Sequence, residues 1–301
     1  MELSVLLDPS ISVELVLQGV VRGSMYAVMA VGLSLIFGIL GIVNFAHGEF
    51  FMIGAYVMYF AVSVLALPIA VGLLAAALLL FVLGMLVERV LIDPLRRRSG
   101  RGWLLDSFVL TIGLTVVLQN LALELLGSQR RGLSEMIAGS IDIFGVTLSY
   151  DRLFILSVAV AIVLSLWAAV RYTDIGKSVR ATSQASDAAR TLGIDIRRVY
   201  TLTFGIGAAL AGVSGALLLT VFPASPTVGM LPVMKGFAVV VLGGLGNIPG
   251  AIVGGLILGV VEAFAVFFFS SGWQHVITAI LVIVILIVRP QGIFTQQSER
   301  P

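Results

Sequence analysis

The sequence contains no cysteine, only two histidines and few charged residues of either sign. Without cysteine, neither disulfide bonds nor thiolate metal sites can form, and two histidines do not complete a usual zinc site. Charged residues make up 11% of the chain, against roughly a quarter in soluble domains. The formal net charge is only +2, and the basic residues occupy short loops between apolar runs, so nucleic-acid binding is not indicated.

Hydrophobic residues make up 59% of the chain and form repeated runs close to the ~20 residues that span a bilayer. This pattern predicts an all-α polytopic membrane protein, with one transmembrane domain over residues 1–301 and the lipid bilayer around it. We expect eight or nine transmembrane or re-entrant helical segments. They lie at about 13–43, 48–65, 68–91, 104–126, 153–170 and 201–222, on either side of 243–250, and at 274–288.

Three of these segments depart from a plain membrane span. The first is too long for one straight crossing and contains Gly32, Gly38 and Gly41, so we expect a tilt or a break near its end. The second and the seventh are short and interrupted by glycine, so either can be re-entrant instead of crossing the bilayer.

Basic residues concentrate in two loops, 89–101 and 171–200. Because loops rich in Lys and Arg stay on the cytoplasmic side, we place both loops there, together with the C-terminus. Three segments precede the first of these loops, which puts the N-terminus outside. The long loop 127–151 is then extracytoplasmic.

The loop at 171–200 is a polar island in an apolar chain and carries six of the eighteen Lys and Arg residues. Small apolar residues recur within it at helical spacing and predict one helical face: Ala181, Ala185, Ala188, Ala189 and Leu192. Ser186 suits the N-cap of a short helix, and Gly193 suits its left-handed end. A compact helical loop of this kind favours docking into a groove of another protein, the alternative being an ordinary ordered loop.

Polar residues also interrupt the apolar runs at Asn44, His47 and Glu49. Such groups are costly in hydrocarbon, so they must face protein or a wet cavity. Gly41 and Gly48 flank them and permit a break that points helix ends into a cavity. The alternative is an ordinary turn outside the membrane.

A second interruption starts at Lys235 and continues through the glycine-rich stretch 243–250. Lys235 can balance Glu49 or Glu262, or extend from the end of a span to the interface, which we favour slightly. The glycines of the stretch 243–250 predict a broken segment. Two interruptions in opposite halves are typical of a transporter built from two inverted repeats. The candidate translocation-path residues are Asn44, His47, Glu49, Lys235, Gly243, Gly244 and Asn247.

Three other functional interpretations have weaker support from the sequence. Gly176-Lys177-Ser178 lacks the earlier glycine of a phosphate loop, because position 171 is arginine. Residues 212–215 match the GxSG of rhomboid intramembrane proteases, with Ser214 as nucleophile and His275 as base, although helix packing explains the same glycines. An ion-coupled secondary transporter would instead use His47, Glu49 and Lys235 as a relay.

The stretch NFAHGEFFMIGAY (44–56) resembles the integral-membrane permeases of bacterial ABC importers for branched-chain amino acids, of the LivH type. The resemblance extends over nearly the whole chain. It includes RGSMYAVMAVG from residue 22, ATSQASDAARTLGIDIRRVYTLTF from residue 181, KGFAVVVLGGLGNIPGA from residue 235 and the ending RPQGIF.

The resemblance implies an inner-membrane permease that is not an enzyme and binds no cofactor, since ATP and Mg²⁺ belong to two separate ATPase subunits. A second homologous permease and a periplasmic or extracellular solute-binding protein complete the importer. The loop at 171–200 would contain the coupling helix, which contacts the ATPase. The matching positions are Gly176, Arg180, Ala181, Ala188, Ala189, Gly193 and Ile194, and Asp187 and Leu192 are further candidates for the contact with the ATPase.

The resemblance places branched-chain or other hydrophobic amino acids first among substrates, with urea and short amides next. Family members often carry a more charged stretch where this chain has Ala185-Ser186-Asp187, so the contact with the ATPase differs in detail. Selectivity belongs largely to the solute-binding protein, and no tight site within the membrane is expected.

Overall fold

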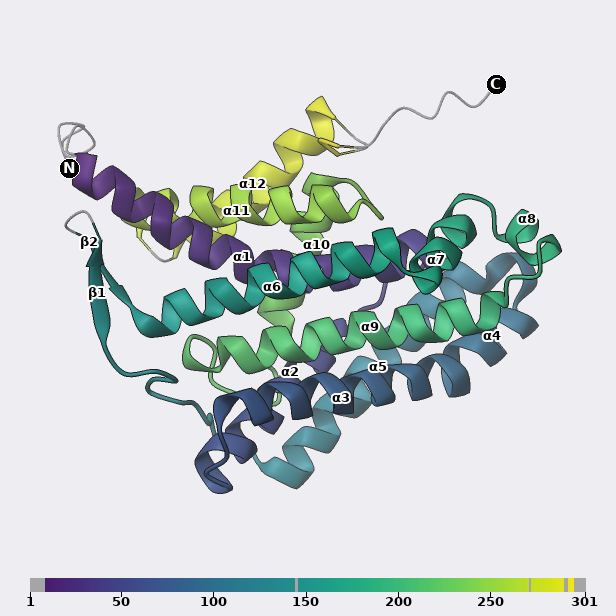
Figure 1. The fold of residues 1–301 in the computed structure, drawn as a ribbon, viewed down its shortest axis with the longest axis horizontal. Helices are drawn as coiled ribbons and strands as arrows, with labels where there is room; N and C mark the ends of the chain where they lie inside the picture. The colour runs from purple at the N-terminus through teal and green to yellow at the C-terminus, as the bar shows by residue number, and fades with distance from the viewer. Residues whose placement is uncertain (1–8, 144–145, 271, 290–291, 295–301) are drawn as a thin grey trace.

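The computed structural model describes residues 9–143, 146–270, 272–289 and 292–294, and shows an elongated bundle of helices (Figure 1). The first six helices are α1 (Pro9–Leu40), α2 (His47–Tyr59), α3 (Ile69–Val87), α4 (Asp93–Arg98), α5 (Trp103–Leu126) and α6 (Tyr150–Tyr172). The other six are α7 (Asp174–Gln184), α8 (Ser186–Thr191), α9 (Ile196–Leu217), α10 (Met230–Gly243), α11 (Ile248–Phe269) and α12 (Trp273–Val288). Strands β1 (Ser140–Ile143) and β2 (Val146–Ser149) form an antiparallel hairpin.

Within the described residues, seven helical spans are long and apolar enough to cross a membrane. They are α1, α2 with the π-helical turn that extends it to Val64, α3 with its continuation to Arg98, α5, α6, α9 and α11. The helices α10 and α12 are apolar but shorter, with 14 and 16 residues. The predicted all-α polytopic fold is confirmed, whereas full crossing by the short segments stays a prediction.

The core lies along α1 and α9. In each of these helices 83% of the most apolar window is buried, against 11% in α5 and 17% in α6. Close packing depends on glycine, because a Cβ at Gly23 would lie 2.7 Å from the carbonyl oxygen of Gly255. The same holds between α2 and α9, where a Cβ at Gly54 would collide with the backbone of Gly212. Helices α5 and α6 therefore form the periphery of the chain.

The break expected near the end of the first apolar run follows Leu40. Gly41 has φ +72, a left-handed conformation that ends the helix, and a non-helical link connects it to His47. The sixth expected segment starts earlier than predicted. Helix α9 begins at Ile196, not near residue 201, because the Asp195 side chain caps it by accepting a hydrogen bond from the Arg198 amide at 3.2 Å.

The loop 127–151 folds back onto the bundle instead of extending as turns alone. The Asp151 carboxylate accepts hydrogen bonds from the amides of Met136 and Ile137 at 2.8 and 2.6 Å. The backbone of Arg131 pairs with that of Ala224, which follows α9. These contacts fix the loop against α6 and the end of α9.

Candidate functional site

The polar island forms two helices rather than one. The chain leaves helical geometry at Ala185, which has φ −155 and ψ 93. Ala185 is therefore the N-cap of α8, and the prediction that Ser186 caps this helix is wrong, since Ser186 is its first residue and no side-chain cap is made. Gly193 has φ +84 and ends the segment in the predicted left-handed conformation.

The break also divides the alanines that were expected to share one face. Ala181 belongs to α7, whereas Ala188 and Ala189 belong to α8. Ala189 is 2% exposed and packs into the chain, while Ala188 is exposed and Leu192 is 81% exposed. The exposed surface of this segment therefore includes Ala188 and Leu192. The remaining candidates on the exposed side are Asp187 and Gly193, and Ile194 is half-buried.

Two of the predicted coupling residues hold α7 against the end of α6. The Arg180 guanidinium donates hydrogen bonds to the carbonyls of Val170 and Arg171, which end α6. A Cβ at Gly176 would collide with the carbonyl of Val170. In this structure Gly176 and Arg180 thus position α7 against α6 within the chain.

Asn44, His47 and Glu49 are 1%, 0% and 1% exposed at the start of α2. The Nε2 of His47 lies 3.2 Å from the carbonyl oxygen of Met29, and Oε1 of Glu49 accepts a hydrogen bond from Nε2 of Gln119 at 2.8 Å. The Asn44 amide, Nδ1 of His47 and Oε2 of Glu49 have no hydrogen-bond partner in the part of the chain that the structure describes. Among the described residues the same is true of single atoms of Ser34, Tyr56, Glu88, Arg96 and Thr203. What distinguishes this group is that three residues within six positions share the condition.

The sequence analysis missed Gln119, which reaches Glu49 from α5. A signal was present, because glutamine inside an apolar run is as unusual as the residues singled out around Asn44. Only the fold shows that α5 and the start of α2 lie side by side.

The favoured prediction that Lys235 extends to the membrane interface is wrong. It is 4% exposed, and its Nζ lies 2.9 Å from Oε2 of Glu262, the second of the two partners considered. The Tyr26 hydroxyl accepts a hydrogen bond from Lys235 and donates one to Glu262, both at 2.8 Å. Thr278 and Gln274 also donate to the Glu262 carboxylate. This network joins α1, α10, α11 and α12 in the buried interior.

The glycine-rich stretch is a broken segment, as predicted. Helix α10 ends at Gly243, Gly244 and Gly246 have φ +102 and +81, and α11 starts at Ile248. Asn247 caps α11, since its Oδ1 accepts a hydrogen bond from the Gly250 amide at 2.8 Å. A Cβ at Gly243 would collide with Gly250, so glycine permits the close return of the chain.

The two interruptions of the apolar pattern meet in space. A Cβ at Gly38 would lie 3.0 Å from Cα of Gly246, so the end of α1 touches the turn between α10 and α11. The ring of Phe45 contacts the ring of Phe237 on α10, with 5.0 Å between centroids. An inverted relation between the halves stays a prediction.

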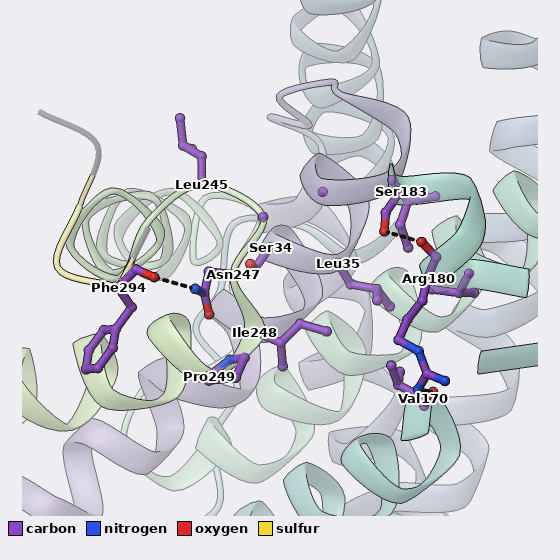
Figure 2. A pocket seen from close by; sticks show the side chains of 14 residues that line it. Ser34, Leu35, Val170, Arg180, Ser183, Leu245, Asn247, Ile248, Pro249 and Phe294 are labelled. Atoms are coloured by element: carbon purple, nitrogen blue, oxygen red, sulfur yellow. Dashed lines mark hydrogen bonds between the residues drawn. The ribbon is translucent and has the colours of Figure 1, made fainter. Parts of the chain in front are cut away.

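A cavity of about 520 Å³ lies between α7, in the segment predicted to couple to the ATPase (174–194), and the glycine-rich turn. Figure 2 shows Arg180 and Ser183 of α7 on one side of it, Asn247 on the other, and Ser34 of α1 between them. Residues predicted separately for ATPase coupling and for the path therefore line one space. Movement of α7 relative to the turn would change its volume.

The described residues provide neither a catalytic pair nor a metal site. Ser214 is buried and donates to the carbonyl of Met25 at 3.4 Å, whereas His275 is exposed on α12 and no hydrogen bond joins the two within the described ranges. No group of three or more His, Asp or Glu side chains in those ranges could hold a metal ion.

Comparison with known proteins gives a consistent result. Residues 15–286 match the family model "Branched-chain amino acid transport system / permease component". The chain is 36% identical to the high-affinity branched-chain amino acid transport system permease protein LivH of Salmonella typhimurium, over 91% of this chain and 92% of that protein. It is 30% identical to the permease protein LivM of Escherichia coli (89% and 67%) and 28% identical to the fructose import permease protein FrcC of Rhizobium meliloti (73% and 61%). No solved structure matches the chain.

These similarities decide between the classes of protein left open by the sequence. The matched family consists of transport permeases, so the chain is a transport subunit and not a protease, and it has no cofactor of its own. It is a multi-pass membrane protein that works with partner subunits. From the match over residues 15–286, this chain belongs to the family of permease components of branched-chain amino acid transport systems.

Proposed function

We propose that this chain forms, with a second related permease, the path by which branched-chain amino acids cross a bacterial inner membrane. The observation that carries the proposal is the 36% identity to LivH over 91% of the chain. The 30% identity to LivM supports a second permease of related sequence. The similarity to a fructose permease supports our view that a separate solute-binding protein selects the substrate.

In this proposal the N-terminus and the loop 127–151 face outside, and α7, α8 and the C-terminus face the cytoplasm. Two ATPase subunits supply the energy, and α8 docks on one of them. Leu192 supports this docking, because an apolar side chain that is 81% exposed on a polar segment suits a pocket in a partner. Ala188 lies beside it and permits close approach of the two surfaces.

The path passes Asn44, His47 and Glu49, whose unpaired polar atoms can bind the ammonium or carboxylate of a passing amino acid. Gln119 belongs with them through its contact with Glu49. Gly243, Gly244 and Asn247 shape the turn beside the cavity, and Lys235 holds the helices around the path.

The docking surface is tested with Ala188→Glu in the complete importer. We expect loss of ATP-driven leucine uptake with normal membrane insertion, because a charged side chain would separate the two surfaces. Ala189→Glu would be ambiguous, since Ala189 is buried and its replacement disturbs the chain itself. Ser128→Glu, exposed in the opposite loop, is the matched control and should leave uptake unchanged. Full uptake with Ala188→Glu would contradict docking at α8.

The substrate is tested by competition in the same importer with its solute-binding protein. We expect unlabelled leucine, isoleucine and valine to displace labelled leucine. Displacement by urea or acetamide instead, without an effect of the amino acids, would favour the amide alternative.

A further inference from the structure

Asp93, in the loop that connects the third and fourth predicted segments, is surrounded by three arginines. Its side chain is 2% exposed, and its carboxylate oxygens lie 2.6 Å from Arg96, 3.1 Å from Arg97 and 3.0 Å from Arg197. Arg96 and Arg97 belong to α4, like Asp93, whereas Arg197 is the second residue of α9. One buried carboxylate therefore joins two elements about a hundred residues apart.

A second contact reinforces this junction one turn earlier in the chain. Glu88 is 0% exposed, and its Oε2 accepts a hydrogen bond from the Thr201 hydroxyl of α9 at 2.6 Å. The Arg96 guanidinium lies 3.9 Å from the other oxygen of Glu88 and 4.3 Å from the centroid of the Tyr200 ring. The extension of α3 into α4 is thus held to the first turns of α9 by charged and cation–π contacts.

The junction lies where the coupling segment enters the bundle. Helix α9 follows α8 after four residues, and Ala189 of α8 accepts a backbone hydrogen bond from Ile194 at 3.1 Å. Farther along, α9 packs against α3 at Gly84, where a Cβ would lie 2.5 Å from Cβ of Ala208. It also packs against α2, where a Cβ at Gly215 would collide with the carbonyl of Phe51. Displacement of α9 must therefore displace α2, which begins at His47.

We propose that Asp93 is a positioning residue that makes α4 and α9 move as one body when the coupling segment is displaced. The proposal rests on the proposed function, because the displacement is produced by an ATPase at α8. Without the carboxylate, the three guanidinium groups would lie close together without a counter-charge and repel, although those of Arg97 and Arg197 are 60% and 47% exposed. Helix α4 would then separate from α9 and would no longer follow the movement of the coupling segment, although α9 keeps its direct contact with α3 at Gly84.

The test uses the complete importer in proteoliposomes and measures leucine uptake per ATP hydrolysed. We expect Asp93→Arg and Arg197→Asp each to lower this ratio about tenfold, in the range of energies that couple contacting residues. The double variant, which exchanges the two charges, should restore most of the ratio because it restores the attraction between α4 and α9. Arg198→Gln is the matched control, since Arg198 is 84% exposed and pairs only with Asp195 among the described residues.

Each result distinguishes a specific failure. If the unchanged importer shows no ATP-dependent uptake, the proposed function fails and the ratio is undefined. If uptake and hydrolysis fall in proportion to the amount of assembled complex, Asp93 only stabilises the fold and the proposal is overturned. If the charge-reversing variants do not assemble, Asp93→Asn replaces Asp93→Arg and Arg197→Gln replaces Arg197→Asp. The expected fall in the ratio is the same. An unchanged ratio in these variants would also overturn the proposal.

Discussion

Two buried polar clusters differ in how completely their groups are paired. Around Lys235, the ammonium pairs with the Glu262 carboxylate and donates a hydrogen bond to Tyr26. The same carboxylate accepts hydrogen bonds from Gln274 and Thr278. Around Asn44, His47 and Glu49, several nitrogen and oxygen atoms have no partner among the described residues. The sequence gives no hint of this difference, because both clusters are short polar interruptions of apolar runs.

We propose that the difference separates a structural role from a transport role. A satisfied network in a low-dielectric interior holds its helices in one arrangement, whereas removal of one member is costly. Unpaired buried groups cost free energy in the state that buries them, and they are retained where another state or a ligand pairs them. We therefore propose that the Lys235 cluster belongs to the scaffold of the bundle and the Asn44 cluster to the path.

The largest expected effect is on the scaffold. Glu262→Gln leaves the buried Lys235 ammonium without a counter-charge, and loss of one partner of a buried ion pair costs about 3–5 kcal/mol of stability. We expect a corresponding loss in the free energy of unfolding, measured by denaturant titration of the purified chain in mild detergent. Uptake should fall together with the amount of folded protein.

The matched control is the double variant Lys235→Met with Glu262→Gln. It removes the unpaired charge and keeps one amide oxygen as the acceptor for either Tyr26 or Thr278, which donate to different oxygens of Glu262, so a large part of the lost stability should return. Recovery of stability without recovery of uptake would show that Lys235 acts on the substrate, and would remove the distinction between the two clusters.

A smaller effect on stability but a large one on transport is expected at Glu49. In Glu49→Gln the new amide oxygen can still accept the hydrogen bond from Gln119, and the unpaired buried group becomes a neutral NH2, which costs less to bury than a carboxylate oxygen. The free energy of unfolding should therefore stay the same or rise. A hydrogen bond to a charged group contributes about 1.5–3 kcal/mol, so we expect uptake per assembled importer to fall about tenfold or more.

Gln119→Leu is the companion variant, because it removes the partner of Glu49 from the side of α5. It should also lower uptake more than stability. Equal losses of uptake and stability in both variants would assign the Asn44 cluster to the scaffold as well.

The sequence predicts the helices of this fold well, because the periodic run of apolar residues determines where a chain can cross a bilayer. The breaks near Gly41 and Gly244 were predicted because glycine can adopt left-handed backbone angles, and both residues do so in the structure. The start of α9 was placed too late because Arg197 and Arg198 were counted with the polar loop 171–200, and the Asp195 cap was not recognised.

The site was only partly predictable. Asn44, His47 and Glu49 were found from their cost in a membrane, but their unpaired atoms and their neighbour Gln119 depend on packing between distant helices. Lys235 could not be paired correctly, since Glu49 and Glu262 were equally good partners by charge. The alanine face was drawn on one continuous helix, and a single extended residue, Ala185, divides it.

The smallest expected effect tests the turn beside the cavity, where Asn247 was predicted as a path residue and is found as a helix cap. Asn247→Ala removes the acceptor for the Gly250 amide and the donor to the Phe294 carbonyl at 3.0 Å. Loss of an N-cap costs about 1 kcal/mol, so the free energy of unfolding should fall by that amount. Asn247→Asp keeps the cap and should recover most of the stability, because aspartate is an equally good N-cap residue, although it cannot donate to the Phe294 carbonyl. If uptake follows stability through this pair, Asn247 only shapes the turn. Uptake lost in Asn247→Asp at full stability would place its amide in the path, and the unpaired cluster at Asn44 would then be one end of a longer polar route.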